Sequence, residues 1–177
     1  MVEWSETLPK CREDIVPPMT TPLAHGIEIH PPATGLADRC EPILRSVPEW
    51  FGIEESVIEY IEAIARMPTA LATHDDQPIG FMTLEHHFPA SAELHVLAIR
   101  PEWHRKGVGA AMLAAIENHA KNLGVRFLQV KTLSPHREND HYARTRHWYE
   151  AMGFEPLTEF LTLWDEANPC LQMIKVL

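Results

Sequence analysis

The pattern of this chain changes from strand-like to helical at Gly107, and this change constrains the fold more than any other feature. Three successive segments before it are typical of strands: Thr69 to His74, Ile79 to His87 and Ala92 to Ile99. Beyond Gly107 apolar residues recur at helical spacing, and Gly124 stands where a helix C-cap belongs. The apolar positions are Val108, Met112, Ile116, Ala120 and Leu123. The sequence therefore predicts a strand meander joined directly to one long helix.

The remaining segments extend this pattern in both directions. Ile27 to His30 alternates like a first strand, which Pro31 and Pro32 are expected to stop, and the first two meander strands meet at Asp75 to Pro78. Helices are expected over Thr34 to Leu44, Glu54 to Met67 and Tyr142 to Met152, and further strands over Phe127 to Leu133, Glu155 to Trp164 and Cys170 to Val176. The order β-α-α-β-β-β-α-β-α-β-β predicts an α+β (mixed α/β) sheet with helices on its faces.

Length, charge and cysteine use limit the functional classes. The 177 residues suit one domain, expected over residues 27–177 after an irregular, proline-rich extension over residues 1–26. A formal net charge of -10 disfavours nucleic acid and favours a cationic partner. The chain has no secretory signal at its start and no apolar run of about 18 residues, so we expect a cytoplasmic protein without a membrane partner. Cys11, Cys40 and Cys170 are expected to be free thiols. The sequence leaves open whether the protein forms a homodimer.

The segment from His104 to Ala110 joins the last meander strand to the long helix. Its two glycines allow a ligand to approach the backbone closely, and the first N–H groups of a helix have no intrahelical acceptor. The helix dipole favours negative charge at this end, and Arg105 and Lys106 add cations beside it. Such a turn suits a pyrophosphate, although the same Gly-x-Gly pattern also serves as a plain tight turn.

Two further motifs give this turn a context. Leu97-Ala98-Ile99-Arg100-Pro101-Glu102 precedes it, and Trp148-Tyr149-Glu150-Ala151-Met152-Gly153-Phe154 follows one strand later. Together with the turn they resemble the GNAT superfamily of N-acetyltransferases, whose pattern is a hydrophobic strand, a proline followed by a [Gln/Arg]-x-x-Gly-x-[Gly/Ala] turn, and a Tyr-Glu-x-x-Gly-Phe helix end. The resemblance extends over residues 27–177. It implies the GNAT acyl-CoA N-acyltransferase fold, a central mixed and mostly antiparallel sheet of six or seven strands flanked by four helices.

The same resemblance implies an enzyme that transfers the acetyl group of acetyl-CoA to a primary amine. A small-molecule amine is the first acceptor class, and no metal is expected. Two alternatives stay open. The first is a protein acetyltransferase that acts on lysine or on an N-terminal amine, and the second is a protein without catalytic activity that binds and senses acyl-CoA.

The family pattern also implies two sets of contacts to coenzyme A. The strand edge at Leu97, Ala98 and Ile99 would pair with the pantetheine arm and present an amide N–H to the thioester oxygen. The pyrophosphate would be bound by the turn and the helix start, formed by His104, Arg105, Lys106, Gly107, Val108, Gly109 and Ala110. The chain departs from the family pattern twice, with His104 in place of Gln or Arg and with Tyr142 in place of a frequent Asn.

Three side chains are candidates for proton transfer. An alkylamine with a pKa of about 10.4 is only about 0.04% free base at pH 7, so attack on the thioester needs a proton acceptor. Glu93 resembles the strand glutamate that serves as this base in part of the family, and His95 is the second candidate because histidine titrates near neutral pH. Strand alternation would place Glu93, His95, Leu97 and Ile99 on one face. Tyr149 matches the tyrosine that protonates the departing thiolate in many members.

Each of these three residues also has a purely structural interpretation: a solvated strand carboxylate, a hydrogen-bonded histidine and a packed aromatic ring. Metal binding is not expected, because His86 and His87 point to opposite faces of a strand and cannot easily share one ion with His95.

The family resemblance places the acceptor site against Val47 to Glu55 and against the loop Ser134 to Asp140. Glu49, Glu54 and Glu55 lie near Trp50 and would suit a cationic amine, or they form only a solvated helix start. The aromatic residues Trp50, Phe51 and Trp148 either line the acceptor pocket or fill the core.

Overall fold

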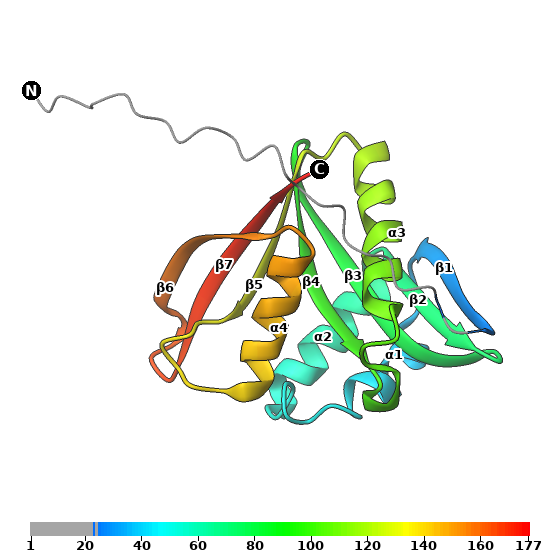
Figure 1. Ribbon diagram of the computed structural model, residues 1–177, viewed down its shortest axis with the longest axis horizontal. Coiled ribbons are helices and arrows are strands. Elements are labelled where there is room, and N and C mark those ends of the chain that lie inside the picture. The colour runs from blue at the N-terminus through cyan, green and yellow to red at the C-terminus, as the bar shows by residue number, and fades with distance from the viewer. Residues whose placement is uncertain (1–22, 24) are drawn as a thin grey trace, which may run out of the picture.

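The computed structural model describes residues 23 and 25–177, so most of the extension expected over residues 1–26 lies outside the described residues. Within them, seven strands form one sheet in the order β1-β2-β3-β4-β5-β7-β6, flanked by four α-helices (Figure 1). The strands are β1 (Ile27–Ala33), β2 (Thr69–His74), β3 (Gln77–Phe88), β4 (Ser91–Ile99), β5 (Phe127–Leu133), β6 (Glu155–Asp165) and β7 (Asn168–Val176). The helices are α1 (Ala37–Leu44), α2 (Glu54–Arg66), α3 (Val108–Asn122) and α4 (Asp140–Ala151), with a 3-10 turn η1 (Pro101–Trp103).

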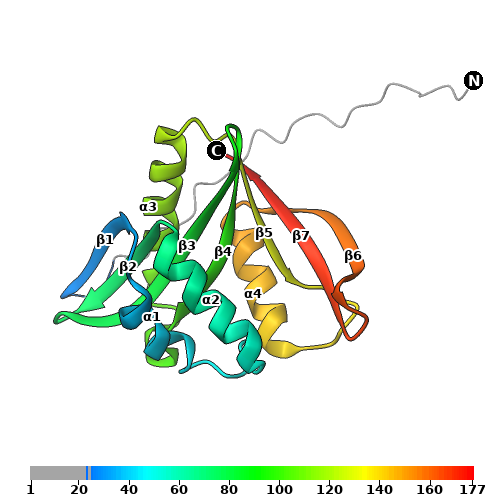
Figure 2. The same ribbon diagram turned by 180° about the vertical axis from the view of Figure 1, so that it is seen from behind.

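The helices cover both faces of the sheet. Helices α3 and α4 lie on the face toward the viewer in Figure 1, and α1 and α2 lie on the other face, which Figure 2 turns toward the viewer. Each face has its own buried apolar cluster. The cluster under α3 and α4 includes Met112, Ile116, Leu128, Tyr149 and Phe154, and the one under α1 and α2 includes Ile43, Leu44, Ile64 and Phe81.

The first strand runs through both prolines to Ala33, so the expectation that Pro31 and Pro32 stop it is wrong. β1 is an edge strand that pairs only with β2, and its register shifts between His30 and Ala33. An edge strand tolerates proline because its outward N–H groups need no partner in the sheet. The following helix begins at Ala37, three residues later than Thr34.

The hairpin between β2 and β3 is tighter than expected. Its turn consists of Asp75 and Asp76 alone, with φ angles of 49° and 63°, and His74 pairs with Gln77 across it. Two successive left-handed residues are typical of a type I′ turn, whose twist matches that of the flanking strands. Pro78 therefore lies in β3 rather than in the turn.

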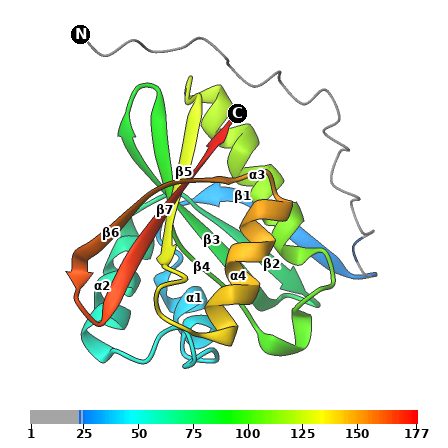
Figure 3. The same cartoon turned by 60° about the vertical axis from the view of Figure 1, so that its left-hand side comes forward.

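β4 and β5 are parallel neighbours that pair over only part of their length. Ser91 to Leu94 of β4 pair with Phe127 to Val130 of β5, while β4 continues to Ile99 and β5 to Leu133. The two strands separate beyond Leu94, as the ribbon shows from the side in Figure 3. This separation leaves one edge of β4, from His95 to Ile99, without a strand partner and forms the framework of the candidate site.

Candidate functional site

Helix α3 begins next to the end of β4 that diverges from β5. Its N-cap is Gly107, with a φ of 80°, and no side chain caps the helix. Arg105 in the preceding turn also has a positive φ, of 57°. The first amides of the helix, at Val108 and Gly109, have no intrahelical acceptor because of their position. The turn therefore presents amide donors at the positive end of the helix dipole, an arrangement that favours phosphate groups.

The space between the separated ends of β4 and β5 is called the opening below. Close packing holds the start of α3 against β4 and α4, on the two sides of this opening. A Cβ at Gly109 would lie 3.1 Å from Trp148 of α4 and 3.3 Å from Ile99 of β4, so a larger residue would push the helix away. The imidazole of His104 engages the strand end, with Nε2 2.8 Å from the Ile99 carbonyl oxygen. Sequence reasoning assigned Gly109 to ligand approach, and the structure gives it a packing role as well.

A β-bulge at His95 changes the phase of β4. Thr83 of β3 pairs with Val96 and the next residue, Leu84, pairs with Leu94, so His95 is an extra residue in β4. A bulge of this kind bends the strand and shifts the side-chain alternation by one position.

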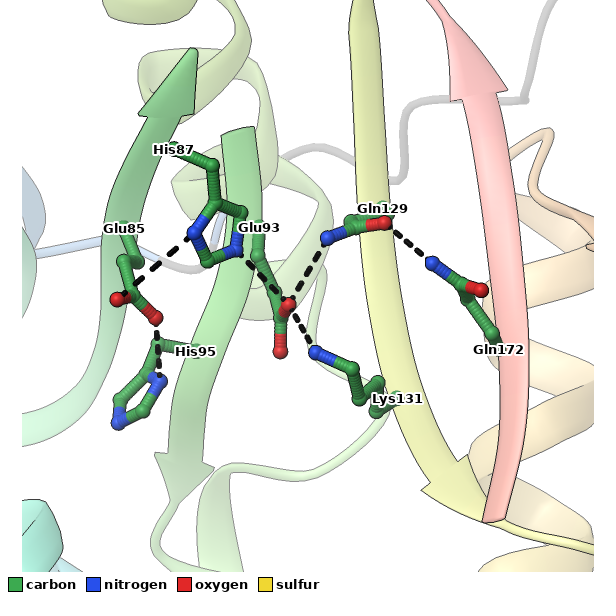
Figure 4. A network of polar contacts seen from close by, with 7 residues as sticks. All are labelled: Glu85, His87, Glu93, His95, Gln129, Lys131 and Gln172. Carbon is green, nitrogen blue, oxygen red and sulfur yellow. Dashed lines mark hydrogen bonds and ion pairs between the residues drawn. The ribbon is translucent and has the colours of Figure 1, made fainter. Parts of the chain in front are cut away.

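The expectation that Glu93, His95, Leu97 and Ile99 share one face is therefore wrong. Leu97 and Ile99 pack against the apolar cluster under α3 and α4. His95 lies on the opposite face, where its ring contacts Tyr60 of α2 edge to face with ring centres 5.7 Å apart. Glu93 lies on this α2 side with His95 (Figure 4). The side chains of the two base candidates therefore lie on one face of the sheet, and those of Leu97 and Ile99 lie on the other.

Glu93 is buried, with 5% of its surface exposed, at the point where β4 and β5 part. Its Oε2 accepts a hydrogen bond from Gln129 at 3.0 Å and from Lys131 at 2.5 Å, both on β5, and lies 3.1 Å from Nε2 of His87 (Figure 4). The carboxylate is therefore joined to β5 by the two side chains that flank Val130, the last residue of β5 that pairs with β4. Taking up a proton at Glu93 would remove the charge that pairs with the half-buried Lys131 ammonium.

His95 has simpler contacts than Glu93. Its Nδ1 lies 3.2 Å from Oε2 of Glu85 on β3, and in the described part of the chain Nε2 has no polar partner. The side chain is 27% exposed, so the ring is accessible without being fully solvated. An imidazole with one nitrogen next to a carboxylate and the other free has the form of a general base.

Tyr149 of α4 lies on the other face, with 5% of its surface exposed. Its ring packs against the rings of Trp148 and Phe154, with ring centres 5.2 and 5.6 Å away. Burial raises the pKa of Tyr149 well above its ordinary value, and the nearby phenols of Tyr142 and Tyr60 raise it further. The phenol therefore stays protonated at neutral pH, as a proton donor must.

Trp50 connects the α1–α2 segment to both sides of the opening. Its indole N–H donates to Oγ1 of Thr145 at 3.0 Å, and its ring contacts the imidazoles of His141 and His104 edge to face. The Tyr142 hydroxyl donates to the Trp50 carbonyl at 3.0 Å, and burial raises the pKa of Tyr142 to about 12. The hydroxyl of Tyr142, expected at a coenzyme A contact, is thus engaged with protein here.

The two expected acceptor walls differ in character. Glu54 and Glu55 form the first turn of α2, and Arg45 makes a bidentate contact with Glu54 at 2.9 Å that lowers the pKa of this carboxyl. These residues therefore match the helix-start interpretation better than a free acidic patch. The second wall borders a hollow of about 570 Å³ between the β5–α4 loop and the β6–β7 hairpin, lined in part by Arg137, Glu138 and Leu161.

Two absences hold for the part of the chain that the structure describes. There, no three histidine, cysteine, aspartate or glutamate side chains come together in a way that could hold a metal ion. None of the described helices is both long enough and apolar enough to cross a membrane.

Sequence reasoning missed the partners of the base candidates. Glu85, His87 and Lys131 come from strands on either side of β4, and only the sheet order brings them to Glu93 and His95. The alternation of Glu85 and His87 on one face of β3 was the available signal, but it does not identify the facing residues of β4.

Comparisons with known proteins agree with this geometry. The model of the acetyltransferase (GNAT) domain matches residues 67–156, which is half of the chain. An amino-acid acetyltransferase of Pseudomonas syringae pv. syringae is 41% identical over 66 residues, and this match covers 37% of the chain but only 13% of the relative. The match to the family model includes the β4–α3 turn and Tyr149.

Solved structures share the fold at low sequence identity. A GNAT family acetyltransferase from Elizabethkingia anophelis with acetyl-CoA bound superposes with a TM-score of 0.66 at 17% identity, over 87% of this chain and 100% of that one. The ribosomal-protein-S18-alanine N-acetyltransferase of Escherichia coli gives a TM-score of 0.67 at 17% identity, over 85% and 93% of the two chains. The expected fold, with seven strands and four helices in the described residues, is thereby confirmed.

Proposed function

Because this chain belongs to the GNAT acetyltransferase family, we propose that it transfers the acetyl group of acetyl-CoA to the primary amine of a small molecule. The observation that carries this proposal is the junction of β4 and α3. There an unpaired strand edge leads directly into a turn of free amides at a helix N-terminus. This combination suits a ligand with a long polar arm and a pyrophosphate.

We assign the cofactor contacts to these two elements. The amides from Arg105 through Ala110 bind the pyrophosphate, and the cations of Arg105 and Lys106 lie next to it. The edge from Leu97 to Ile99 pairs with the pantetheine arm as an added strand would, which places the thioester near the separation point of β4 and β5. A strand amide there would donate to the oxyanion that forms when the amine attacks.

The contacts favour His95 over Glu93 as the proton acceptor. Glu93 already accepts from Lys131 and Gln129, whereas Nε2 of His95 is free. The amine nitrogen attacks the thioester carbon, and its proton passes to His95. As the tetrahedral intermediate collapses, the carbon–sulfur bond breaks and the Tyr149 hydroxyl protonates the departing thiolate. The raised pKa of Tyr149, which keeps its phenol protonated at neutral pH, supports this role.

The acceptor class is the open part of the proposal. The relative named amino-acid acetyltransferase makes free amino acids the first compounds to test, although the chain covers only 13% of that protein. Acceptors of protein origin are the second class, and a catalytically silent acyl-CoA binder is the third.

A panel of amines tests the function directly. Amino acids, polyamines, amino sugars and peptides with free lysine or N-terminal amines are each incubated with acetyl-CoA, and released thiol is measured. We expect thiol release with at least one small amine, and a loss of about 100-fold or more in His95→Gln. Thiol release with peptides alone would show that the acceptors are proteins and not small molecules. Tight acetyl-CoA binding without release from any amine would leave only the binding role.

A further inference from the structure

The carboxylate of Glu85 lies between two imidazoles on the α2 side of the sheet. Its Oε2 is 3.2 Å from Nδ1 of His95, and its Oε1 is 3.8 Å from Nδ1 of His87 (Figure 4). His87 in turn reaches Glu93 at 3.1 Å. The half-buried carboxylate of Glu85, with 33% of its side chain exposed, thus lies next to His95, the bulged residue that we assign as the base.

We propose that Glu85 is a positioning residue that fixes the tautomer of His95. A neutral imidazole carries its proton on one nitrogen only, and a carboxylate next to Nδ1 favours the proton there. Nε2 then holds a free lone pair and is the nitrogen that takes the proton of the attacking amine. This inference rests on the proposed function for its catalytic consequence, but the tautomer itself is a property of the free protein.

The bulge separates this pairing from the end of β4. Ordinary strand alternation places His95 on the same side as Glu93, and the extra residue turns the side chains beyond it, Leu97 and Ile99, to the face under α3. On the α2 side, Glu85 of β3 and Tyr60 of α2 flank the His95 ring. The His95 imidazole therefore lies between the Glu85 carboxylate and the Tyr60 ring, and its Nε2 has no polar partner among the described residues.

A polar network extends from Glu85 across the sheet. His87 bridges Glu85 and Glu93, Lys131 neutralises Glu93, and Gln129 extends the array to Gln172 of β7 through a further hydrogen bond. His87 lies against Glu85 at 3.8 Å, which is the range of an ion pair rather than of a hydrogen bond. Glu93 thus supports the site without accepting the reaction proton.

The nitrogen-15 NMR spectrum of the histidine side chains in the free, full-length protein tests this assignment. The resonances of His95 are identified by their absence in His95→Gln, and spectra are recorded at a pH where the imidazole is neutral. We expect the Nδ1–H tautomer in the wild type, a shift toward Nε2–H in Glu85→Met, and an intermediate result in Glu85→Gln, whose amide oxygen still accepts a hydrogen bond. Glu62→Met, which removes an exposed carboxylate from α2, is the matched control and should leave the tautomer unchanged.

Kinetics provides the second readout. In Glu85→Met we expect kcat to fall by about 10- to 100-fold with an unchanged KM for acetyl-CoA, and Glu85→Gln should recover part of the loss. An Nε2–H tautomer in the wild type, or the same tautomer in Glu85→Met, would overturn the inference even if the enzyme is active. A tautomer shift in a protein that acetylates no amine would instead uphold the positioning role and reject the proposed function. Thermal unfolding of each variant shows whether the fold is intact.

Discussion

At the scale of single residues, the two proposed proton-transfer groups differ in burial and in the face of the sheet on which they lie. His95 is half-buried on a bulge, whereas Tyr149 is buried on the other face. The Tyr149 phenol also responds to Tyr60, which belongs to a helix on the other face of the sheet.

Replacing Tyr149 by Phe removes the proposed proton donor and little else. Burial raises the pKa of Tyr149, so in the wild type its hydroxyl stays protonated and the rate has no decline from its ionisation below a pH of about 10. We expect kcat of Tyr149→Phe to fall by about 100-fold, with acetyl-CoA binding and thermal stability nearly unchanged. Steady-state kinetics and calorimetric titration measure the two effects. A loss of less than about twofold would leave Tyr149 as a packing residue.

At the scale of elements, local pattern predicted the four α-helices and seven strands of the described residues, but not how the strands meet. The bulge at His95 could not be predicted, because it is defined by Thr83 and Leu84 on a different strand. The prediction that Pro31 and Pro32 end β1 was wrong for a related reason, since only the sheet order shows that β1 is an edge strand. The polar network around Glu93 depends on the same pairing. Motifs within one segment, such as the β4–α3 turn, carry their geometry locally and were therefore predictable.

The two ends of α3 offer a matched test of the pyrophosphate site. Gly107 precedes the helix with a φ of 80°, and Gly124 follows it with a φ of 83°, so any side chain is similarly strained at either position. We expect Gly107→Glu to weaken acetyl-CoA binding by about 10- to 100-fold, because its carboxylate would repel the pyrophosphate. Gly124→Glu should bind as the wild type does. Calorimetric titration measures both, and equal affinities in the two variants would show that the site lies elsewhere.

At the scale of the whole molecule, the described residues bury thiols and phenols on both faces of the sheet. Burial raises the pKa of Cys40 to about 12, of Cys170 to about 11 and of Tyr142 to about 12. It also raises the pKa of Tyr60 and Tyr149. Each of these groups therefore holds its proton in the folded protein at a pH where the unfolded chain has released it.

This difference makes the fold sensitive to alkali. The folded pKa values lie above the unfolded ones, so the stabilisation is fully present below a pH of about 9 and is lost as pH rises toward the folded values. We expect the free energy of unfolding, measured in urea, to be level between a pH of about 7 and 8.5 and to fall steeply above about 9.5. In Cys40→Ala one titrating group is gone, so the slope should become shallower by about 1.4 kcal/mol per pH unit, although this variant is less stable throughout. An unchanged slope in Cys40→Ala would mean that its thiol ionises as easily in the folded protein as in the unfolded chain, and the sealed core under α1 would then be open to solvent.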